Sequence, residues 1–495
     1  MKKSMILKKV MLVLLVAGFT ACTEILEDVE PSTAISFETA LSTPAGINGL
    51  RTSMYDKVLG NFGYTTQYLI GPGALADETF NRPGSTRFQG LNNAVGTSGT
   101  AHLGVFGASF DIIQDANIII NEIPDGVISD ELREQYRGEA LAIRAYVYHN
   151  MARTYGYEPG NTSNGPEANW NLAVMIREDA TLDVSDAVEL PRNTVAEVYT
   201  FIREDLAEAK TLLAGRTDNR YPTEALVDAI RARVELYAGN WSAASTAAQA
   251  AITNSGASLV STEAGVGTMF KGPNSEAIWE LDVNPSTEAI AGSNVNSGLA
   301  AYTSDQWVAQ IPTQLVLDRY DAADYRLSGW FESCLTAQTT GATASTCGSV
   351  NSAAAALTKW NGWKGNLVDD VTLVRISEMY LIWAEAAAKA ANSPAAGNGP
   401  LTTLKTARNA GATPAAALVS ITAFEDEILD ERVRELVGEG HRFWDLKRLG
   451  RNILDNTGDI KMRADAYRIL APFGTGEQNI NSLLVENPGY AVSSN

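Results

Sequence analysis

Near its C-terminus the chain reads RVRELVGEGHRFWDLKRLG, from Arg432 to Gly450. Gly438 and Gly440 interrupt a helical pattern here, because glycine readily adopts the backbone conformations that end helices. Asp430 and Arg434 are spaced to pair across one helical turn before this break. The residues after the break include large apolar side chains that favour burial: Phe443, Trp444 and Leu446. The stretch therefore predicts a packed junction between helices.

The same stretch concentrates Arg, His, Asp and Lys, which would also suit a catalytic centre or an anion site. However, no nucleophile signature surrounds His102, His149 or His441, and the chain has no HExxH, GxSxG or phosphate-loop motif. We therefore predict no catalytic residue and interpret the charged groups as partners of helix ends and nearby carboxylates. The structural residues of the junction would be His441, Arg442, Trp444 and Asp445.

Outward from this stretch, apolar residues recur at helical spacing in several segments. Ser129 can cap a helix that runs to Tyr155 with two apolar faces, so this helix must pack against neighbours on both sides. Similar patterns predict helices in three further segments: 195–213, 226–237 and 241–252. In the last of them Ala244, Ala248 and Ala251 would let helices approach closely, as in tetratricopeptide (TPR) repeats.

The middle of the chain, residues 255–370, lacks helical periodicity and is rich in Gly, Asn, Ser and Thr. Within it, residues 276–284 alternate like a short strand. Helical periodicity returns over residues 371–391, and Thr422 with Glu425 predicts a capping box for a later helix. The predicted fold is mainly α: a TPR-like helical-repeat scaffold with a loop-rich, partly β middle lobe.

The first residues are typical of an export signal. Four lysines precede an apolar run from Met11 to Ala21, which is too short to span a bilayer in helix. Cys22 follows a small residue, as in a bacterial lipobox, although Phe19 stands where Leu is usual. We predict lipidation of Cys22, with ordinary cleavage near Ala21 as the alternative.

Charge and cysteine content narrow the class of protein further. The net charge of −20 disfavours binding to nucleic acid or to an anionic membrane face. Cys334 and Cys347 are left as a pair and predict a disulfide in an oxidising compartment. Two cysteines and three scattered histidines show no zinc-ligand spacing, so neither a metal nor a cofactor is predicted.

Several motifs in order carry a resemblance to a known family. They are GEALAIRAYVYHNMARTYG (138–156), RNTVAEVYTFIREDLAEAKTLL (192–213), R-x-x-E-x-x-L-x-x-A-E-A (375–386), the stretch quoted above, and a closing NPGY (487–490). In these motifs the chain resembles the SusD/RagB-type nutrient-binding lipoproteins of the outer membrane. The likeness runs along nearly all of the mature chain.

The resemblance implies a division of the chain and a role. The division would be a signal peptide at 1–21, an acidic tether at 22–36, a helical N-terminal region at 37–254, a ligand-binding lobe at 255–370, and a helical C-terminal region with an extended tail at 371–495. Family members are lipid-anchored on the outer face of the outer membrane and are not enzymes. They capture oligosaccharides, or in some branches peptides, for a partner TonB-dependent porin of SusC type.

The resemblance also implies where ligand binds, namely at an N-terminal loop and the middle lobe. Sugars are held by aromatic faces, with amides, carboxylates and Arg bonding to the hydroxyls. The matching residues here are Arg82, Phe88, Asn92, Tyr302, Asp305, Trp307 and Trp330. Trp279 and Trp383 lie in regular elements and are expected in the core.

Two other functions remain open from the sequence. One is a periplasmic TPR-like interaction scaffold without a small-molecule ligand. The other is a glycosidase with paired carboxylates. Asp77 and Glu78 are adjacent, but in a chain with 58 acidic residues such a pair is almost no evidence for a catalytic site.

Overall fold

The computed structural model describes residues 36–60, 64–82, 84–93, 102–161, 165–288, 298–304, 308–333, 355–365 and 367–490. Their helices are α2 (Phe37–Leu41), α3 (Pro44–Leu59), α4 (Tyr64–Leu69), α5 (Gly71–Leu75), α6 (Gln89–Asn93), α7 (Phe106–Asn121), α8 (Asp130–Tyr155), α9 (Val195–Leu212), α10 (Glu224–Tyr237), α11 (Trp241–Asn254), α12 (Glu263–Val266), α13 (Pro285–Glu288), α14 (Leu299–Thr303), α15 (Gln314–Leu317), α16 (Tyr325–Trp330), α18 (Ile376–Ala391), α19 (Pro394–Ala407), α20 (Ile421–Leu436), α21 (Arg442–Arg448) and α22 (Thr475–Ile480). Short 3₁₀ turns are η2 (Val184–Asp186), η3 (Ala415–Leu418) and η4 (Tyr467–Ile469). The predicted mainly helical fold is confirmed.

The strands are short and pair two by two. They are β1 (Thr79–Asn81), β2 (Ala277–Leu281), β3 (Gln310–Pro312), β4 (Phe331–Ser333), β5 (Ala355–Leu357), β6 (Val371–Arg375), β7 (Ile453–Leu454) and β8 (Ile460–Met462). The antiparallel pairs are β1 with β3, β2 with β6, β4 with β5, and β7 with β8. Each two-stranded unit is too small to be stable alone and depends on the helices around it.

Helix α8 begins as the sequence predicts and is packed on both sides. The hydroxyl of Ser129 accepts a hydrogen bond from the backbone N–H of Leu132 at 3.3 Å, which caps the helix. Helices α7 and α9 pack against α8 and bury nearly every residue from Tyr136 to Tyr155. Buried ion pairs add to this packing, because Arg144 binds Asp205 of α9 through two hydrogen bonds of 2.8 and 2.7 Å.

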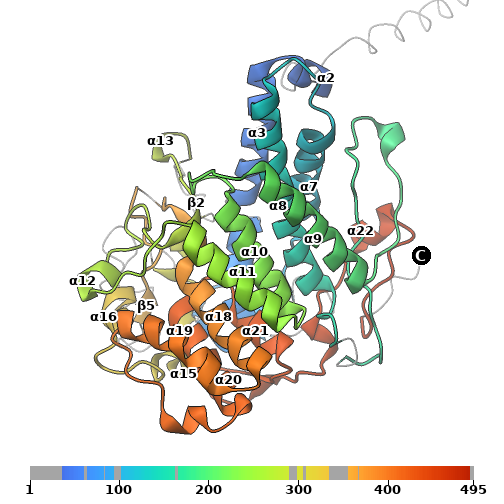
Figure 1. Cartoon of the computed structure of the whole chain (residues 1–495). Helices are drawn as coiled ribbons and strands as arrows, with labels where there is room; N and C mark the ends of the chain where they lie inside the picture. Colours follow the sequence, from blue (N-terminus) through green and yellow to red (C-terminus); the bar gives the residue numbers. More distant parts are fainter. Residues whose placement is uncertain are drawn as a thin grey trace, which may run out of the picture.

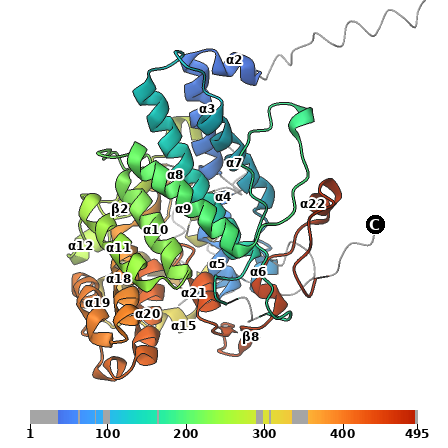
Figure 2. The ribbon, with the colours of Figure 1, turned by 45° about the vertical axis from the view of Figure 1, so that its right-hand side comes forward.

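The helices continue as antiparallel pairs that stack on one another (Figures 1 and 2). Helix α10 pairs with α11, α11 packs on α18, and α18 pairs with α19. The small residues Ala244, Ala248 and Ala251 are fully buried in α11, as the TPR-like pattern predicts. In both views α2 and α3 stand at one end of the molecule, and α19 and α20 stand at the other.

Two local predictions are wrong. Residues 371–375 form strand β6, not the first turn of a helix, because they pair with β2, and α18 begins only at Ile376. The N-cap of α20 is Ser420, whose hydroxyl accepts from the N–H of Ala423, so Thr422 lies inside the first turn. The predicted strand around Trp279 is confirmed as β2, and Trp279 is fully buried there.

Within the described part of the chain, no helix is both long and apolar enough to cross a lipid bilayer.

Candidate functional site

The glycine turn between α20 and α21 is an internal junction. Gly438 and Gly440 have φ angles of 74° and 78°, and a Cβ on Gly440 would collide with the backbone carbonyl of Tyr68. After the turn, the guanidinium of Arg442 donates to both carboxylate oxygens of Asp77 at 2.7 and 2.8 Å. Phe443 and Trp444 have no exposed surface. The turn therefore locks the C-terminal region against the N-terminal segment.

Several other polar groups of the junction bind protein partners, although the ring N–H of Trp444 is buried without a partner among the described residues. Arg432 donates to Asp445 at 2.6 Å, and Lys447 donates to the carbonyls of Arg153 and Gly156 at the end of α8. Burial, together with nearby guanidinium groups, holds the pKa of His441 well below its usual range. The cluster is enclosed and offers no surface to a substrate.

The predicted pairing of Asp430 with Arg434 is wrong. Asp430 instead accepts from Arg319 at 2.9 Å, and Arg434 donates to Glu431 at 2.9 Å. Residues three and four apart compete for the same partner on a helix, and here the tertiary contact with Arg319 decides the pairing.

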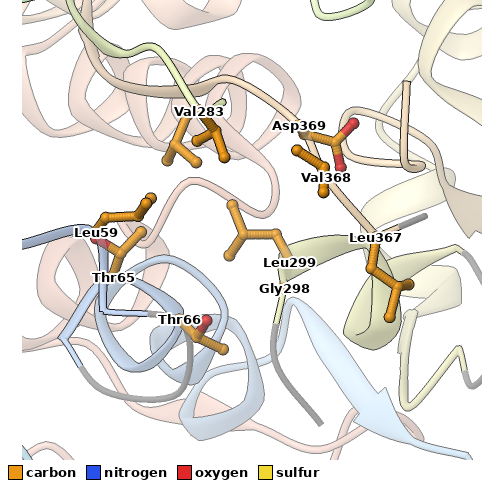
Figure 3. A pocket seen from close by; sticks show the side chains of 10 residues that line it. Leu59, Thr65, Thr66, Val283, Gly298, Leu299, Leu367, Val368 and Asp369 are labelled. Atoms are coloured by element: carbon orange, nitrogen blue, oxygen red, sulfur yellow. The ribbon is translucent and has the colours of Figure 1, made fainter. Parts of the chain in front are cut away.

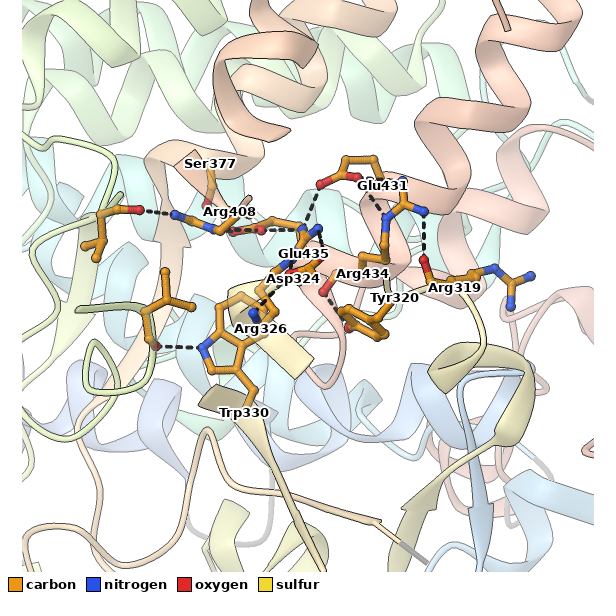
Figure 4. A network of polar contacts seen from close by, with 12 residues as sticks. Arg319, Tyr320, Asp324, Arg326, Trp330, Ser377, Arg408, Glu431, Arg434 and Glu435 are labelled. Atoms are coloured by element: carbon orange, nitrogen blue, oxygen red, sulfur yellow. Dashed lines mark hydrogen bonds and ion pairs between the residues drawn. The ribbon is translucent and has the colours of Figure 1, made fainter. Parts of the chain in front are cut away.

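A larger set of buried charges ties the middle of the chain to α20 (Figure 4). Glu435 receives hydrogen bonds from Arg326, Arg375 and Arg408, and these side chains are at most 1% exposed. Burial alone would raise the pKa of Glu435, but the three guanidinium groups hold it well below its usual range. Such a paired network is structural and leaves no reactive group open to solvent.

The candidate ligand surface lies where the N-terminal loop meets α14. The ring of Phe88 packs against the ring of Tyr302 with centroids 4.8 Å apart and planes inclined by 32°. The guanidinium carbon of Arg87 lies 5.8 Å from the centroid of Tyr302. Tyr302 is nearly buried, whereas Phe88 and Arg87 are only half-buried. We call Arg82, Arg87, Phe88 and Tyr302 the Phe88 platform.

Two arginines of the platform lie close enough for their charges to interact. Burial lowers the pKa of Arg82, and the charge of Arg87 lowers it further. Burial also raises the pKa of Tyr302, while the cation of Arg87 opposes that shift. An aromatic face beside guanidinium donors suits the C–H face and the hydroxyl groups of a sugar.

The platform is positioned by the β1–β3 pair. Gln310 of β3 donates to the side-chain oxygen of Asn81 at 2.9 Å and to the backbone carbonyl of Arg87 at 3.0 Å. Its own side-chain oxygen accepts from the hydroxyl of Thr79 at 3.1 Å. A single buried amide thus fixes the loop that carries Arg87 and Phe88.

The backbone at the platform is strained. Phe88 has a φ angle of 56° and Val308 one of 39°. A residue other than glycine in this region costs about 1–3 kcal/mol, and such strain clusters at functional sites. The packing around Phe88 therefore holds the ring in a position that its backbone alone disfavours.

Sequence reasoning brought together only part of this surface. Phe88 and Tyr302 meet in the platform, and Arg82 is linked to it through its charge interaction with Arg87. Asn92 instead anchors α6 by donating to the carbonyls of Ala74 and Thr79. Trp330 is 2% exposed and belongs to a second, smaller hydrophobic core together with Val266 and Phe270. Its ring N–H donates to the backbone carbonyl of Val266. This position does not favour contact with a ligand.

Other predicted residues lie outside the described part of the chain: Cys22, Asp305, Trp307, Cys334 and Cys347. The sequence analysis did not name Arg87 of the platform or Gln310, which fixes the loop that carries it. Arg87 could have been noticed beside Phe88, but Gln310 gave no signal, because its role depends on the pairing of strands that lie far apart in sequence.

A small cavity near α4 is too tight for a sugar (Figure 3). Its volume is about 30 Å³, close to the space of one water molecule, and Leu59, Thr65 and Val368 are among its lining residues. Asp369 at its edge accepts from the backbone N–H groups of Gly362 and Trp363 at 3.0 and 2.8 Å. Burial raises the pKa of Asp369 to about 6.

Among the described residues, no group of three or more His, Cys, Asp or Glu side chains is placed to hold a metal ion.

Comparison with known families gives two matches. A model of the SusD family matches residues 354–490, and a model described as "Starch-binding associating with outer membrane" matches residues 26–236. The two matches do not overlap, and together they cover well over half of the 495 residues.

Individual proteins are similar as well. A SusD-like protein (P38) of Formosa agariphila is 27% identical over 263 residues, which make up 52% of this chain and 48% of that protein. The match thus spans about half the length of this relative. A SusD superfamily protein of Bacteroides thetaiotaomicron superposes with a TM-score of 0.75 at 24% identity, covering 90% of this chain and all of the other. A SusD-like carbohydrate-binding protein of Bacteroides vulgatus gives 0.70 at 19% identity, covering 90% and 97%.

Proposed function

Because the chain belongs to the SusD family, we propose that it binds oligosaccharides or polysaccharide fragments at the cell surface and delivers them to a TonB-dependent porin of SusC type. Proteins of this family bind ligands and are not enzymes. The protein would be anchored in the outer membrane by a lipid on Cys22 and would face the cell exterior.

The observation that supports sugar binding is the Phe88 platform. An aromatic ring that is partly exposed, braced by Tyr302 and flanked by the guanidinium of Arg87 provides an apolar face beside a polar group. The platform also joins the two regions from which the family builds its sites, the N-terminal loop and the middle lobe. The alternatives are a peptide ligand at the same surface, or a periplasmic interaction scaffold without a small ligand.

The first test is affinity electrophoresis of the mature chain through gels that contain a panel of polysaccharides. We expect one polymer to retard the protein and Phe88→Asn to weaken that retention roughly fivefold to tenfold, since a ring contact contributes on the order of 1 kcal/mol. Asn tolerates the left-handed backbone at this position, so the change removes the ring without adding strain.

The matched control is Trp241→Leu, which removes another half-buried aromatic ring far along the chain on α11. It should leave the retention unchanged. If no polymer retards the wild-type protein, or if both variants are retained as strongly as the wild type, the sugar-binding role of the platform is wrong. Titration with peptides would then test the peptide alternative.

The membrane anchor is tested separately. Cys22→Ser in the full-length precursor should move the protein from the outer-membrane fraction to a soluble fraction, because a serine hydroxyl cannot form the thioether bond that would carry the lipid. Protease treatment of intact cells that carry the wild-type protein would distinguish a surface protein from a periplasmic scaffold, since the protease reaches only a protein on the cell surface.

A further inference from the structure

A second cleft opens between strand β1 and the β7–β8 hairpin. Its volume is about 560 Å³, within the range of about 300–1,000 Å³ that is usual for small-molecule sites. Its charged lining residues are Asp77, Asp455 and Lys461, and Phe80, Asn92, Asn93 and Asn456 lie beside them. We call it the Lys461 cleft. Strand β1 lines this cleft and also helps to position the Phe88 platform, but the cleft contains none of the platform residues.

Lys461 is a cation held in the wall of this cleft without an ion pair. Its ammonium donates to the carbonyls of Ala74 and Ala76 at 2.7 and 3.1 Å, which uses two of its three N–H groups. No carboxylate of the described chain forms a salt bridge with it. Burial lowers the pKa of Lys461 to about 7, although the charges of Asp77 and Asp455 act to raise it.

The two nearby carboxylates already have partners. Asp77 is bound by both arms of the Arg442 guanidinium. Asp455 accepts from the hydroxyl of Thr457 at 2.6 Å and from the backbone N–H groups of Thr457 and Asp459 at 2.8 and 3.0 Å. Lys461 is therefore left with carbonyl dipoles in place of a counter-ion.

Asn92 offers a second unused group beside Lys461. Its amide nitrogen donates to the carbonyls of Ala74 and Thr79 at 2.8 and 3.0 Å, which fixes the orientation of the side chain. Its amide oxygen is buried and has no hydrogen-bond partner among the described residues. Because Asn92 and Lys461 both donate to the carbonyl of Ala74, a free donor group and a free acceptor lie next to each other.

We propose that the Lys461 cleft binds an anionic sugar unit, whose carboxylate or sulfate accepts from Lys461 while a neighbouring hydroxyl donates to the amide oxygen of Asn92. The ligand anion supplies the counter-ion that the protein lacks, and the hydroxyl satisfies a buried acceptor that is otherwise costly. The half-buried ring of Phe80 and the amides of Asn93 and Asn456 suit the rest of the sugar. This inference rests on the proposed function, because that function is what makes the ligand a saccharide. It adds a second binding site to the Phe88 platform.

The test is saturation-transfer NMR on the mature chain with three probes: glucuronate, glucose 6-sulfate and glucose. At pH 6 we expect at least one anionic probe to bind at least tenfold more tightly than glucose. From pH 6 to pH 8 its affinity should fall about tenfold, because the fraction of Lys461 that carries a proton falls by that factor. Comparison of the two anionic probes identifies carboxylate or sulfate as the source of the charge.

Variants locate the effect. Lys461→Met should remove the preference for the anionic probe, whereas Lys461→Arg should keep the preference and lose the dependence on pH. Trp241→Leu should leave both unchanged, since Trp241 lies on α11 and is part of neither the cleft nor the Phe88 platform. The pH dependence of the wild type tests the proposal even if Lys461→Met does not fold.

The proposal is overturned if glucose binds as well as both anionic probes, if no probe binds, or if the affinity is the same at pH 6 and pH 8. Retention on polysaccharide gels that depends on Phe88 would survive each of these results. Failure of the second site is thereby distinguished from failure of the proposed function.

Discussion

Glu78 shows how one residue joins three parts of the chain. Its carboxylate accepts from the backbone N–H of Gly438 in the glycine turn at 2.8 Å, and its backbone carbonyl accepts from the N–H of Thr313 at 2.9 Å. Asp77 beside it binds Arg442. Burial raises the pKa of Glu78 to about 7, against the lowering effect of Gly438, Lys359 and Arg442.

This shift predicts a pH-dependent stability. Between pH 4.5 and 7 the folded protein keeps a proton on Glu78 that the unfolded chain releases, so Glu78 makes the fold less stable as pH rises through this window. Glu78→Gln keeps an acceptor for Gly438 and removes the titration. We expect the variant to gain roughly 1–3 kcal/mol over the wild type at pH 8 and to gain nothing at pH 4.5. Urea unfolding at the two pH values measures this difference.

The exposed Glu167 provides the control, because Glu167→Gln should not change the unfolding midpoint at either pH. An equal gain from Glu78→Gln at both pH values would show that packing, not protonation, is responsible.

At the scale of elements, the turn between α20 and α21 depends on backbone freedom. Gly440 has positive φ, and a Cβ there would collide with the carbonyl of Tyr68. Gly450, just after α21, also has positive φ (62°), but a Cβ there would meet no atom within 4 Å. The two glycines therefore separate the cost of backbone conformation from the cost of a collision.

We predict that Gly440→Ala lowers the free energy of unfolding by about 3 kcal/mol or more, since the collision adds to the cost of the conformation. Gly450→Ala should cost only about 1 kcal/mol. Thermal unfolding of the two variants checks this order. Similar losses would mean that the backbone around Tyr68 shifts easily and that the glycine turn does not lock the two regions together.

Sequence patterns predicted some elements well and missed others. The stripes of α8, α9, α10 and α11 gave helices near their observed limits, because an amphipathic helix repeats its contacts every few residues. Helices α3 and α7 were not predicted. The prediction of helix for strand β6 is wrong because the strand is buried along its whole length and shows no alternation.

At the scale of the whole molecule, buried charges connect distant segments. Arg408, at the end of α19, donates to Glu276 beside β2 at 2.8 and 2.9 Å and to Glu435 of α20 at 2.7 Å. These contacts cross the expected boundary near residue 370, so the middle of the chain and the C-terminal region are held together. The segment limits at 254 and 370 stay predictions.

We predict that Arg408→Met lowers the free energy of unfolding by about 3–5 kcal/mol, because it leaves Glu276 and Glu435 short of a buried partner. Arg451→Met is the matched control. Arg451 binds Glu425 and Asp426 but is 34% exposed, so its loss should cost at most about 1 kcal/mol. Urea unfolding of both variants compares them, and equal losses would contradict a special role for the buried network.

The sequence by itself determined the helical scaffold and the family, because both depend on short-range periodicity and on motifs that are contiguous in the chain. It also predicts that the segment around Arg82 and Phe88 takes part in a ligand site, and this stays a prediction. Only the tertiary structure showed that Phe88 packs against Tyr302, that Trp330 is internal, and that Lys461 and Asn92 lie side by side in the wall of a cleft. Each of these observations pairs residues that lie far apart in the chain or depends on burial, which is a property of the packed chain and not of any local stretch.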